Sequence, residues 1–224
     1  MLCDRAQVGN PVQKLRALGV LRNLALLDAA QNDFLTNRVI TVVEKLIDMT
    51  QKIRDLVVHI LRLLSIHKLH DVSLRKSKAI VTLVDFALTG STLQKTHATA
   101  ALRNLSGDVL NYDAFRSVSA IPMMLDFCKL GNAEQILNSV GFIRNLAMDE
   151  YNQATIIRLN AVPILVNICK TMDDAEIIEE AGAALGNLAA NDLCVPYLET
   201  SQAIDVMVNL LASSSVLQRS VAIK

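Results

Sequence analysis

The sequence predicts an all-α protein made of stacked three-helix units, and three observations lead to this prediction. A short motif recurs at a nearly constant spacing, a second marker keeps that spacing, and the composition favours helices. Apolar residues make up 52% of the 224 residues and aromatic residues 4%, with 8 Gly and 4 Pro. Leu, Ile, Val and Ala must therefore form the core, and long runs of good helix formers favour helices over a sheet.

The first marker is a five-residue motif that ends in Asn-Leu. Its clearest copy is Ala-Leu-Arg-Asn-Leu at 101–105, and similar copies lie at 20–24, 142–146 and 184–188. A degenerate copy at 60–64 has Leu63 in place of the Asn. The fourth positions of the five copies are 23, 63, 104, 145 and 187, so the steps between them are 40, 41, 41 and 42 residues.

The second marker is the start of an apolar segment, which reads Ile121-Pro122 in one copy and Val162-Pro163 in the next. Equivalent segments start at Val39, Ile80 and Ile204, so the steps are again 41, 41, 41 and 42 residues. Two independent markers with one period over five copies establish an internal repeat of about 41 residues.

Each repeat is expected to contain three helices, and residues 107–147 illustrate the pattern. Helices are predicted near 111–118, 121–129 and 133–147. Pro122 lies in the first turn of the second helix, where its missing N–H does no harm. The third helix has apolar residues at helical spacing, and one repeat alone cannot bury that face. The repeats are therefore expected to stack into a solenoid.

A three-helix unit of this length, with Leu-x-Asn-Leu in the third helix and Ile/Val-Pro opening the second, resembles the armadillo repeat. The resemblance implies a right-handed α-α superhelix, an armadillo solenoid, over essentially the whole chain. The expected organisation is a partial repeat 1–25, repeats 26–65, 66–106, 107–147 and 148–189, and a partial repeat 190–224. The chain is expected to begin in a third helix at 13–24 and to end in one near 217–220. Such uncapped ends would fit a segment of a longer protein, or end-to-end self-association.

The recurring Asn is the main candidate for a binding residue. Asn is less favourable than Ala inside a helix by about half a kcal/mol, so four copies at one position need a reason. Its amide both donates and accepts, so a column of such amides can hold the backbone of an extended peptide. The resemblance implies the same role in a concave groove. The alternative is that each Asn joins neighbouring helices. The expected groove contains Asn104, Asn145 and Asn187, with Asn23 separated from them by Leu63.

Positions near each Asn on the third helix complete the expected groove. The residue four positions earlier is never Trp, unlike in the importin-α-like branch, so the chain resembles the beta-catenin-like branch more closely and fits an extended peptide or a partner helix. Seven positions earlier, the character changes, and the groove candidates there are His97, Asn138 and Glu180. Arginines precede four of the five motif positions and are candidates for pairing with carboxylates or with groups of the stack: Arg22, Arg62, Arg103 and Arg144.

Charge, cysteine spacing and hydropathy exclude several other classes. Residues 1–112 contain 15 Lys/Arg and 9 Asp/Glu, whereas residues 113–224 contain 7 and 13, which disfavours a nucleic-acid binder with a basic face along its length. The four cysteines have no disulfide-like spacing, so an intracellular, cytoplasmic location is expected, with the nucleus, cilium or cytoskeleton as alternatives. No apolar stretch reaches the roughly 18 residues that a membrane span requires.

Catalysis and cofactor binding are not expected. No P-loop, GxSxG, HExxH or dinucleotide-binding motif occurs, and no set of catalytic groups converges. His67 and His70 are three apart, but the first shell of a metal site is incomplete, so a solvated loop is the preferred interpretation. The sequence therefore predicts a non-enzymatic scaffold or adaptor that binds an extended partner segment in the groove. The alternative is an architectural spacer of a cytoskeletal or ciliary assembly that uses convex or end surfaces.

Overall fold

The computed structural model describes residues 1–36 and 38–212, and these residues form sixteen α-helices and no strand. The predicted all-α fold is therefore confirmed. The chain divides into two compact units, Met1–Ala114 (unit 1) and Phe115–Lys224 (unit 2). Each unit is described by itself below.

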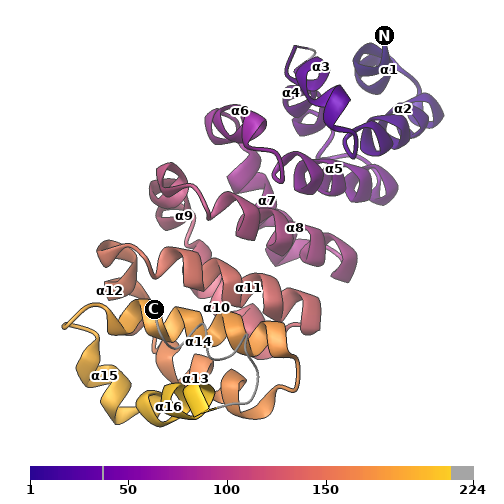
Figure 1. Ribbon diagram of the computed structural model, residues 1–224. Coiled ribbons are helices and arrows are strands. Elements are labelled where there is room, and N and C mark those ends of the chain that lie inside the picture. The colour runs from indigo at the N-terminus through magenta and orange to yellow at the C-terminus, as the bar shows by residue number, and fades with distance from the viewer. Residues whose placement is uncertain (37, 213–224) are drawn as a thin grey trace. The chain divides into compact units, whose positions relative to one another are not determined.

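The helices of unit 1 follow one another in a repeating order of short, middle and long (Figure 1). Single 3-10 turns at Asp28–Ala30, Lys68–His70 and Val109–Asn111 precede the short helices. The α-helices are α1 (Leu2–Val8), α2 (Pro11–Leu24), α3 (Gln31–Thr36), α4 (Val39–Glu44), α5 (Gln51–Leu64), α6 (Asp71–Lys76), α7 (Ala79–Thr89), α8 (Thr92–Leu105) and α9 (Tyr112–Ser117), of which α9 contains the boundary with unit 2.

Unit 2 continues with the same order of helices. They are α10 (Ala120–Leu130), α11 (Ala133–Leu146), α12 (Glu150–Arg158), α13 (Ala161–Thr171), α14 (Ala175–Ala189), α15 (Val195–Thr200) and α16 (Ala203–Ala212). The three helices predicted within 107–147 correspond to α9, α10 and α11, and their ends agree to within about a residue or two, the usual uncertainty of helix ends.

The beginning of the chain differs from the prediction. A helix, α1, precedes α2 and packs against both α2 and α4, so residues 13–24 are not the first helix of the chain. The sequence Leu-Cys-Asp-Arg-Ala-Gln-Val is too short to show a helical period, and only its packing makes it recognisable as a helix. The third helix predicted near 217–220 lies outside the described residues.

The turn before the long helix is built in the same way in three places. Asn10, Ser91 and Asn132 are N-caps, and each exchanges hydrogen bonds with the Gln three residues later in a capping box. A Gly precedes each cap. A Cβ on Gly90 would lie 2.4 Å from the carbonyl oxygen of Phe86, so only glycine allows the chain to turn this closely.

The core of each unit consists of the apolar faces of the long helices. In the recurring motif, Leu102 and Leu105 are buried on either side of the exposed Asn104. The same pattern holds in unit 2, where Ile143 and Leu146 are buried and Phe142 packs edge-to-face on Phe115 at 5.0 Å. Each such side chain contributes about 1.5–3 kcal/mol through its burial. The motif thus places its Arg and Asn on the surface of the long helix.

Candidate partner-binding surface

The long helices of each unit lie side by side and carry the predicted binding residues. In unit 1, α5 packs between α2 and α8, and in unit 2, α11 packs on α14 (Figure 1). Unit 1 therefore contains Asn23 and Asn104, whereas unit 2 contains Asn145 and Asn187. Within unit 2, the structure brings Asn145 and Asn187 onto two helices in contact.

Two of the asparagines join neighbouring long helices. The Asn104 amide nitrogen donates to Ser65 Oγ at 3.0 Å, and that of Asn187 donates to the carbonyl oxygen of Arg144 at 2.9 Å. Both bonds cross from one repeat to the one before it, which supports the alternative that these asparagines hold the stack together. Both bonds use the amide nitrogen, so each side chain keeps its carbonyl oxygen as an acceptor for a partner's N–H.

The arginines of the motif also have partners inside their own unit. Arg22 donates through Nε and Nη2 to Oδ1 of Asn23, and Arg144 donates in the same way to Asn145. Arg62 instead contacts His97, and Arg103 is half-buried on α8. Arg22 and Arg144 thus hold the amides of Asn23 and Asn145 in position.

The residues seven positions before the Asn of the motif are more buried than a groove surface would require. His97, Asn138 and Glu180 are 8%, 6% and 6% exposed. Glu180 forms an ion pair with Arg144 at 3.1 Å, which links α14 to α11. Because this contact covers the carboxylate, Glu180 offers a partner little surface, and its binding role stays a prediction.

Position 63, where the Asn is missing, also has a structural explanation. Leu63 is buried with 7% exposure, and Ser65 two residues later provides the oxygen to which Asn104 donates. On α5, the polar groups that take the place of the Asn are His59 and Arg62, and the His59 ring stacks on the His97 ring at 4.3 Å. The surface of unit 1 at this point therefore consists of imidazole and guanidinium groups.

His70 is not in a solvated loop, and the preferred interpretation of its sequence neighbourhood is wrong. It is 1% exposed, and its Nε2 lies 2.7 Å from Oε1 of Gln31 in the preceding repeat. Burial lowers the pKa of His70, with a smaller effect from His67. The ring is therefore a neutral component of the stack.

Gln31 and His70 belong to a set of buried polar residues at the start of the short helices, which the sequence analysis did not identify. Gln31 donates to the carbonyl oxygen of Ala25, Asn111 to that of Leu105 and Gln153 to that of Ala147, at 2.8–3.0 Å. These bonds satisfy carbonyl groups at the ends of long helices. Their spacing of about 40 residues is the signal that the sequence contains for them, although their residue types vary.

Two of the cysteines, Cys128 and Cys169, lie in surroundings that favour the protonated thiol. Burial raises the pKa of Cys128 and Cys169 to about 12, because a thiolate is disfavoured away from water. Cys128 is buried and Cys169 is half-buried.

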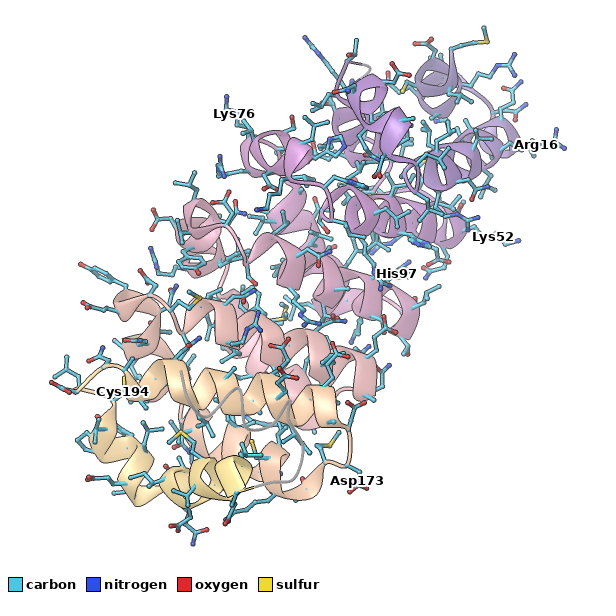
Figure 2. The ribbon with its side chains drawn as sticks, in the orientation of Figure 1. Arg16, Lys52, Lys76, His97, Asp173 and Cys194 are labelled. Atoms are coloured by element: carbon cyan, nitrogen blue, oxygen red, sulfur yellow. The ribbon has the colours of Figure 1, made fainter. Side chains whose placement is uncertain are left out.

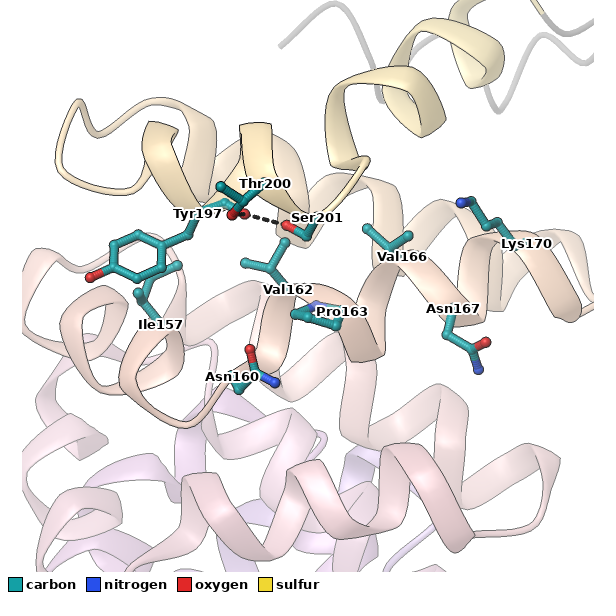
Figure 3. A pocket seen from close by; sticks show the side chains of 10 residues that line it. All are labelled: Ile157, Asn160, Val162, Pro163, Val166, Asn167, Lys170, Tyr197, Thr200 and Ser201. Carbon is teal, nitrogen blue, oxygen red and sulfur yellow. Dashed lines mark hydrogen bonds between the residues drawn. The ribbon is translucent and has the colours of Figure 1, made fainter.

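A second surface of unit 2 is hollowed on the side of the short helices. Two clefts, of about 470 and about 1160 Å³, share Ile157 and Tyr197 and lie along α12, α13 and α15. Figure 3 shows the smaller cleft, with Tyr197, Thr200 and Ser201 on one side and Val162 and Pro163 on the other.

No single helix in residues 1–36 and 38–212 is long and apolar enough to cross a membrane. Helices α12 and α13 reach the required length and hydropathy only together, as a pair bent by 79°.

Comparison with known proteins agrees with this architecture. Residues 149–190, which contain α12, α13 and α14, match the family model of the armadillo/beta-catenin-like repeat. No curated protein matches the chain in sequence.

Solved structures resemble the chain over nearly its whole length. A designed armadillo repeat protein superposes with a TM-score of 0.91 at 19% identity, with 99% of this chain and 95% of that chain covered. A computationally designed armadillo repeat protein for modular peptide recognition gives 0.92 at 19% identity with the same coverage. A third designed armadillo repeat protein, solved in complex with the peptide (KR)4, gives 0.90 at 18% identity, again over 99% and 95%. The chain thus has the armadillo-repeat fold.

Proposed function

We propose that the protein is a non-enzymatic scaffold whose long-helix surfaces bind an extended segment of a partner protein. The observation that carries the proposal is the arrangement of Asn104 and Asn187, whose amide nitrogens are held by the stack and whose carbonyl oxygens remain available as acceptors. Neighbouring helices lie about 8–10 Å apart and an extended strand advances about 3.3 Å per residue, so one amide meets the partner every two to three residues. The likeness to designed armadillo proteins, one of them solved with a bound peptide, supports this proposal.

No Trp lies four residues before any Asn of the motif, which favours the beta-catenin-like over the importin-α-like manner of binding. Those positions hold Gly19, Ala100, Gly141 and Ala183, whereas His59 lies four residues before Leu63, where the Asn is missing. The small side chains at the first four positions allow a partner's backbone or a helix to approach the long helices closely. A cytoplasmic location and end-to-end self-association remain predictions, and light scattering of the purified protein at increasing concentration tests the second.

The test has two steps. Peptides that bind the unmodified protein are first selected from an immobilised library, and their affinity is then measured for a variant in which Asn104, Asn145 and Asn187 are replaced with Ala. The affinity for the selected peptides should fall at least tenfold, because each lost peptide hydrogen bond contributes about 0.5–1.5 kcal/mol. Unchanged affinity with native helicity would exclude binding through the Asn surface.

A matched control separates binding from stacking. Ser65→Ala removes the hydrogen bond that Asn104 makes within the stack but leaves the Asn104 amide in place. If Asn104→Ala weakens peptide binding and Ser65→Ala does not, the amide itself contacts the peptide. If the two variants weaken binding equally, Asn104 acts only by holding α5 and α8 together.

The clefts along α12 and α15 favour a second candidate, an architectural spacer that docks through surfaces other than the long helices. Tyr151 and Leu193, which line the larger cleft, are 80% and 81% exposed. In that case the triple Asn variant would still assemble with its partners, whereas Tyr151→Ala combined with Leu193→Ala would not. Co-sedimentation with the native assembly distinguishes the two candidates.

A further inference from the structure

The long helices of unit 1 are strongly basic. Helices α2, α5 and α8 contain eight Lys and Arg residues and a single acidic residue, Asp55. The long helices of unit 2, α11 and α14, contain four Glu residues and a single Arg. Asp55 accepts a hydrogen bond from the Gln94 amide at 2.7 Å, so this one carboxylate is already engaged within the stack. A partner that lies on these helices of unit 1 therefore meets a positive potential.

Not all of this charge faces a common site. The guanidinium of Arg54 lies 5.0 Å over the ring of Phe86 in α7, and Lys14 reaches Sδ of Met49. Arg16 and Lys52 project from one side of unit 1, whereas Lys76 of α6 projects from the other (Figure 2). The charges that come together with other polar groups are those of two arginines near the histidine pair.

Four residues on three neighbouring helices make up the His–Arg cluster: His59 and Arg62 of α5, His97 of α8, and Arg22 of α2, whose charge acts on His59. The two imidazole rings stack with 4.3 Å between their centroids and an interplanar angle of 26°. Arg62 Nη1 lies 3.0 Å from Nδ1 of His97, and this contact joins α5 to α8. Figure 2 labels His97 on α8.

The contact between Arg62 and His97 determines where the proton of His97 lies. A guanidinium only donates hydrogen bonds, so Nδ1 of His97 must accept, and the neutral ring carries its proton on Nε2. The pKa of His97 is lowered to about 4 by burial, with further effects from His59 and Arg62. Burial also lowers the pKa of His59, and the charges of Arg22 and Arg62 lower it further. The cluster is thus rich in donors and positive charge.

We propose that the His–Arg cluster is an anion site that receives a Glu or Asp side chain of the partner's extended segment, and that His59 takes up a proton as this carboxylate binds. The inference rests on the proposed function and adds the chemistry of the segment bound by unit 1, which is acidic. It is opposite to the basic (KR)4 peptide bound by one designed armadillo protein of similar fold.

Proton uptake follows from the charges around His59. The arginines on α2 and α5 disfavour its protonated form, as does burial against α8. A bound carboxylate offsets both arginine charges and attracts the imidazolium, so the pKa of His59 rises on binding. Asp55 lies one helical turn before His59 and is present before and after binding, so it does not account for the change. Binding should therefore be tighter at lower pH, because the complex holds one more proton than the free protein.

The experiment uses a peptide of alternating Glu and Ser labelled at its N-terminus with tetramethylrhodamine, whose charge and emission do not change between pH 6 and pH 8, with matched peptides that carry Gln or Lys in place of Glu. About eight residues suffice, since an extended segment of that length spans about 26 Å and reaches across three long helices. Fluorescence anisotropy with the full chain at about 0.15 M salt, where the Debye length is about 8 Å, favours short-range contacts over general attraction.

The Glu peptide should bind at least tenfold more tightly than the Gln peptide, and the Lys peptide more weakly than either. Its affinity should be about threefold or more higher near pH 6 than near pH 8, a range in which the peptide and the arginines do not titrate. In the His59→Gln variant, binding should no longer depend on pH in this range. His67→Gln, at a half-buried histidine outside the cluster, should keep the pH dependence of the unmodified protein.

Arg62→Gln should weaken binding of the Glu peptide roughly tenfold, because it removes a charged hydrogen-bond donor. Lys76→Gln changes the net charge by the same amount on the exposed α6 and should have little effect. Circular dichroism establishes whether each variant is folded. If the Arg62→Gln variant is not folded, His59→Gln is the variant that tests the cluster.

Three results would overturn the inference: no preference for the Glu peptide, binding that does not depend on pH, or equal effects of Arg62→Gln and Lys76→Gln. A protein that binds the Gln or Lys peptide through Asn104, Asn145 and Asn187 but does not prefer Glu retains the proposed function and lacks the anion site. Binding of none of the three peptides excludes the anion site, and the proposed function is then decided by the peptides selected from the library.

Discussion

His97 should make the stability of unit 1 depend on pH. The perturbation is acidification, because the pKa of His97 is about 4 in the folded protein and about 6.5 for an unperturbed histidine. Between these values the unfolded chain binds more protons than the folded chain, so the free energy of unfolding rises with pH. The stabilising effect is complete above about pH 6.5 and is lost progressively as the pH falls towards about 4.

The size of the effect follows from the difference in pKa. A pH of about 5 is about 1.5 units below the pKa of histidine in the unfolded chain, and each unit corresponds to about 1.36 kcal/mol. The free energy of unfolding is therefore lower by about 2 kcal/mol than at neutral pH. Partial solvent screening of the ring reduces this figure, which is therefore an upper value. The 8% exposure of His97 keeps the reduction moderate.

The assay is urea denaturation of the unmodified protein and of the His97→Gln variant at several pH values. The difference in the free energy of unfolding between the two proteins cancels the contribution of the titrating groups that do not interact with His97. That difference should shrink by about 2 kcal/mol from about pH 7.5 to about pH 5, because glutamine does not titrate. Curves that stay parallel over this range would refute the assignment of a neutral, buried His97.

The other predictions concern single backbone positions, each tested by urea denaturation. Gly90→Ala should lower the free energy of unfolding by about 1–3 kcal/mol, since its Cβ would lie 2.4 Å from a backbone oxygen, whereas Gly107→Ala, with its nearest atom at 3.5 Å, should be nearly neutral; equal effects would contradict this reasoning. Gly19→Ala should stabilise α2 by up to about 1 kcal/mol, because nothing lies within 4 Å of the new Cβ. Ser119→Gly should stabilise unit 2 by about 1 kcal/mol, since Ser119 is exposed with a positive φ of 54°; a destabilised variant would show that the hydroxyl has a structural role.

Several local features of the fold were predictable because they depend on neighbouring residues in the chain. The two markers with one period showed the repeat, and the spacing of apolar residues located α9, α10 and α11. Other local signals were present but were not recognised. The Gly-Asn or Gly-Ser pairs followed by Gln at 13, 94 and 135 are the capping boxes of α2, α8 and α11.

The positions of αL residues were less accessible to prediction. Arg38, Ser119, Asn160 and Gln202 have positive φ angles of 51–63° at the start of the middle helices. Only Asn160 is of a type that favours this conformation, so the packing of the repeat, and not the residue type, selects it at the other three positions.

The amino-acid sequence alone shows that the chain repeats every 41 residues or so, that each repeat is helical, and that an Arg and an Asn lie next to each other in three of the five motifs, at 22–23, 103–104 and 144–145. These properties follow from the periodicity of residue types, which can be read from the amino-acid sequence of a single chain. What those side chains contact is visible only once the helices are packed. The partners of Asn104, Asn187, His70 and Arg62 lie 35–43 residues away, in the neighbouring repeat. Which atoms meet across two repeats depends on how the helices stack, and a single side chain can donate within the stack or to a partner with the same chemistry.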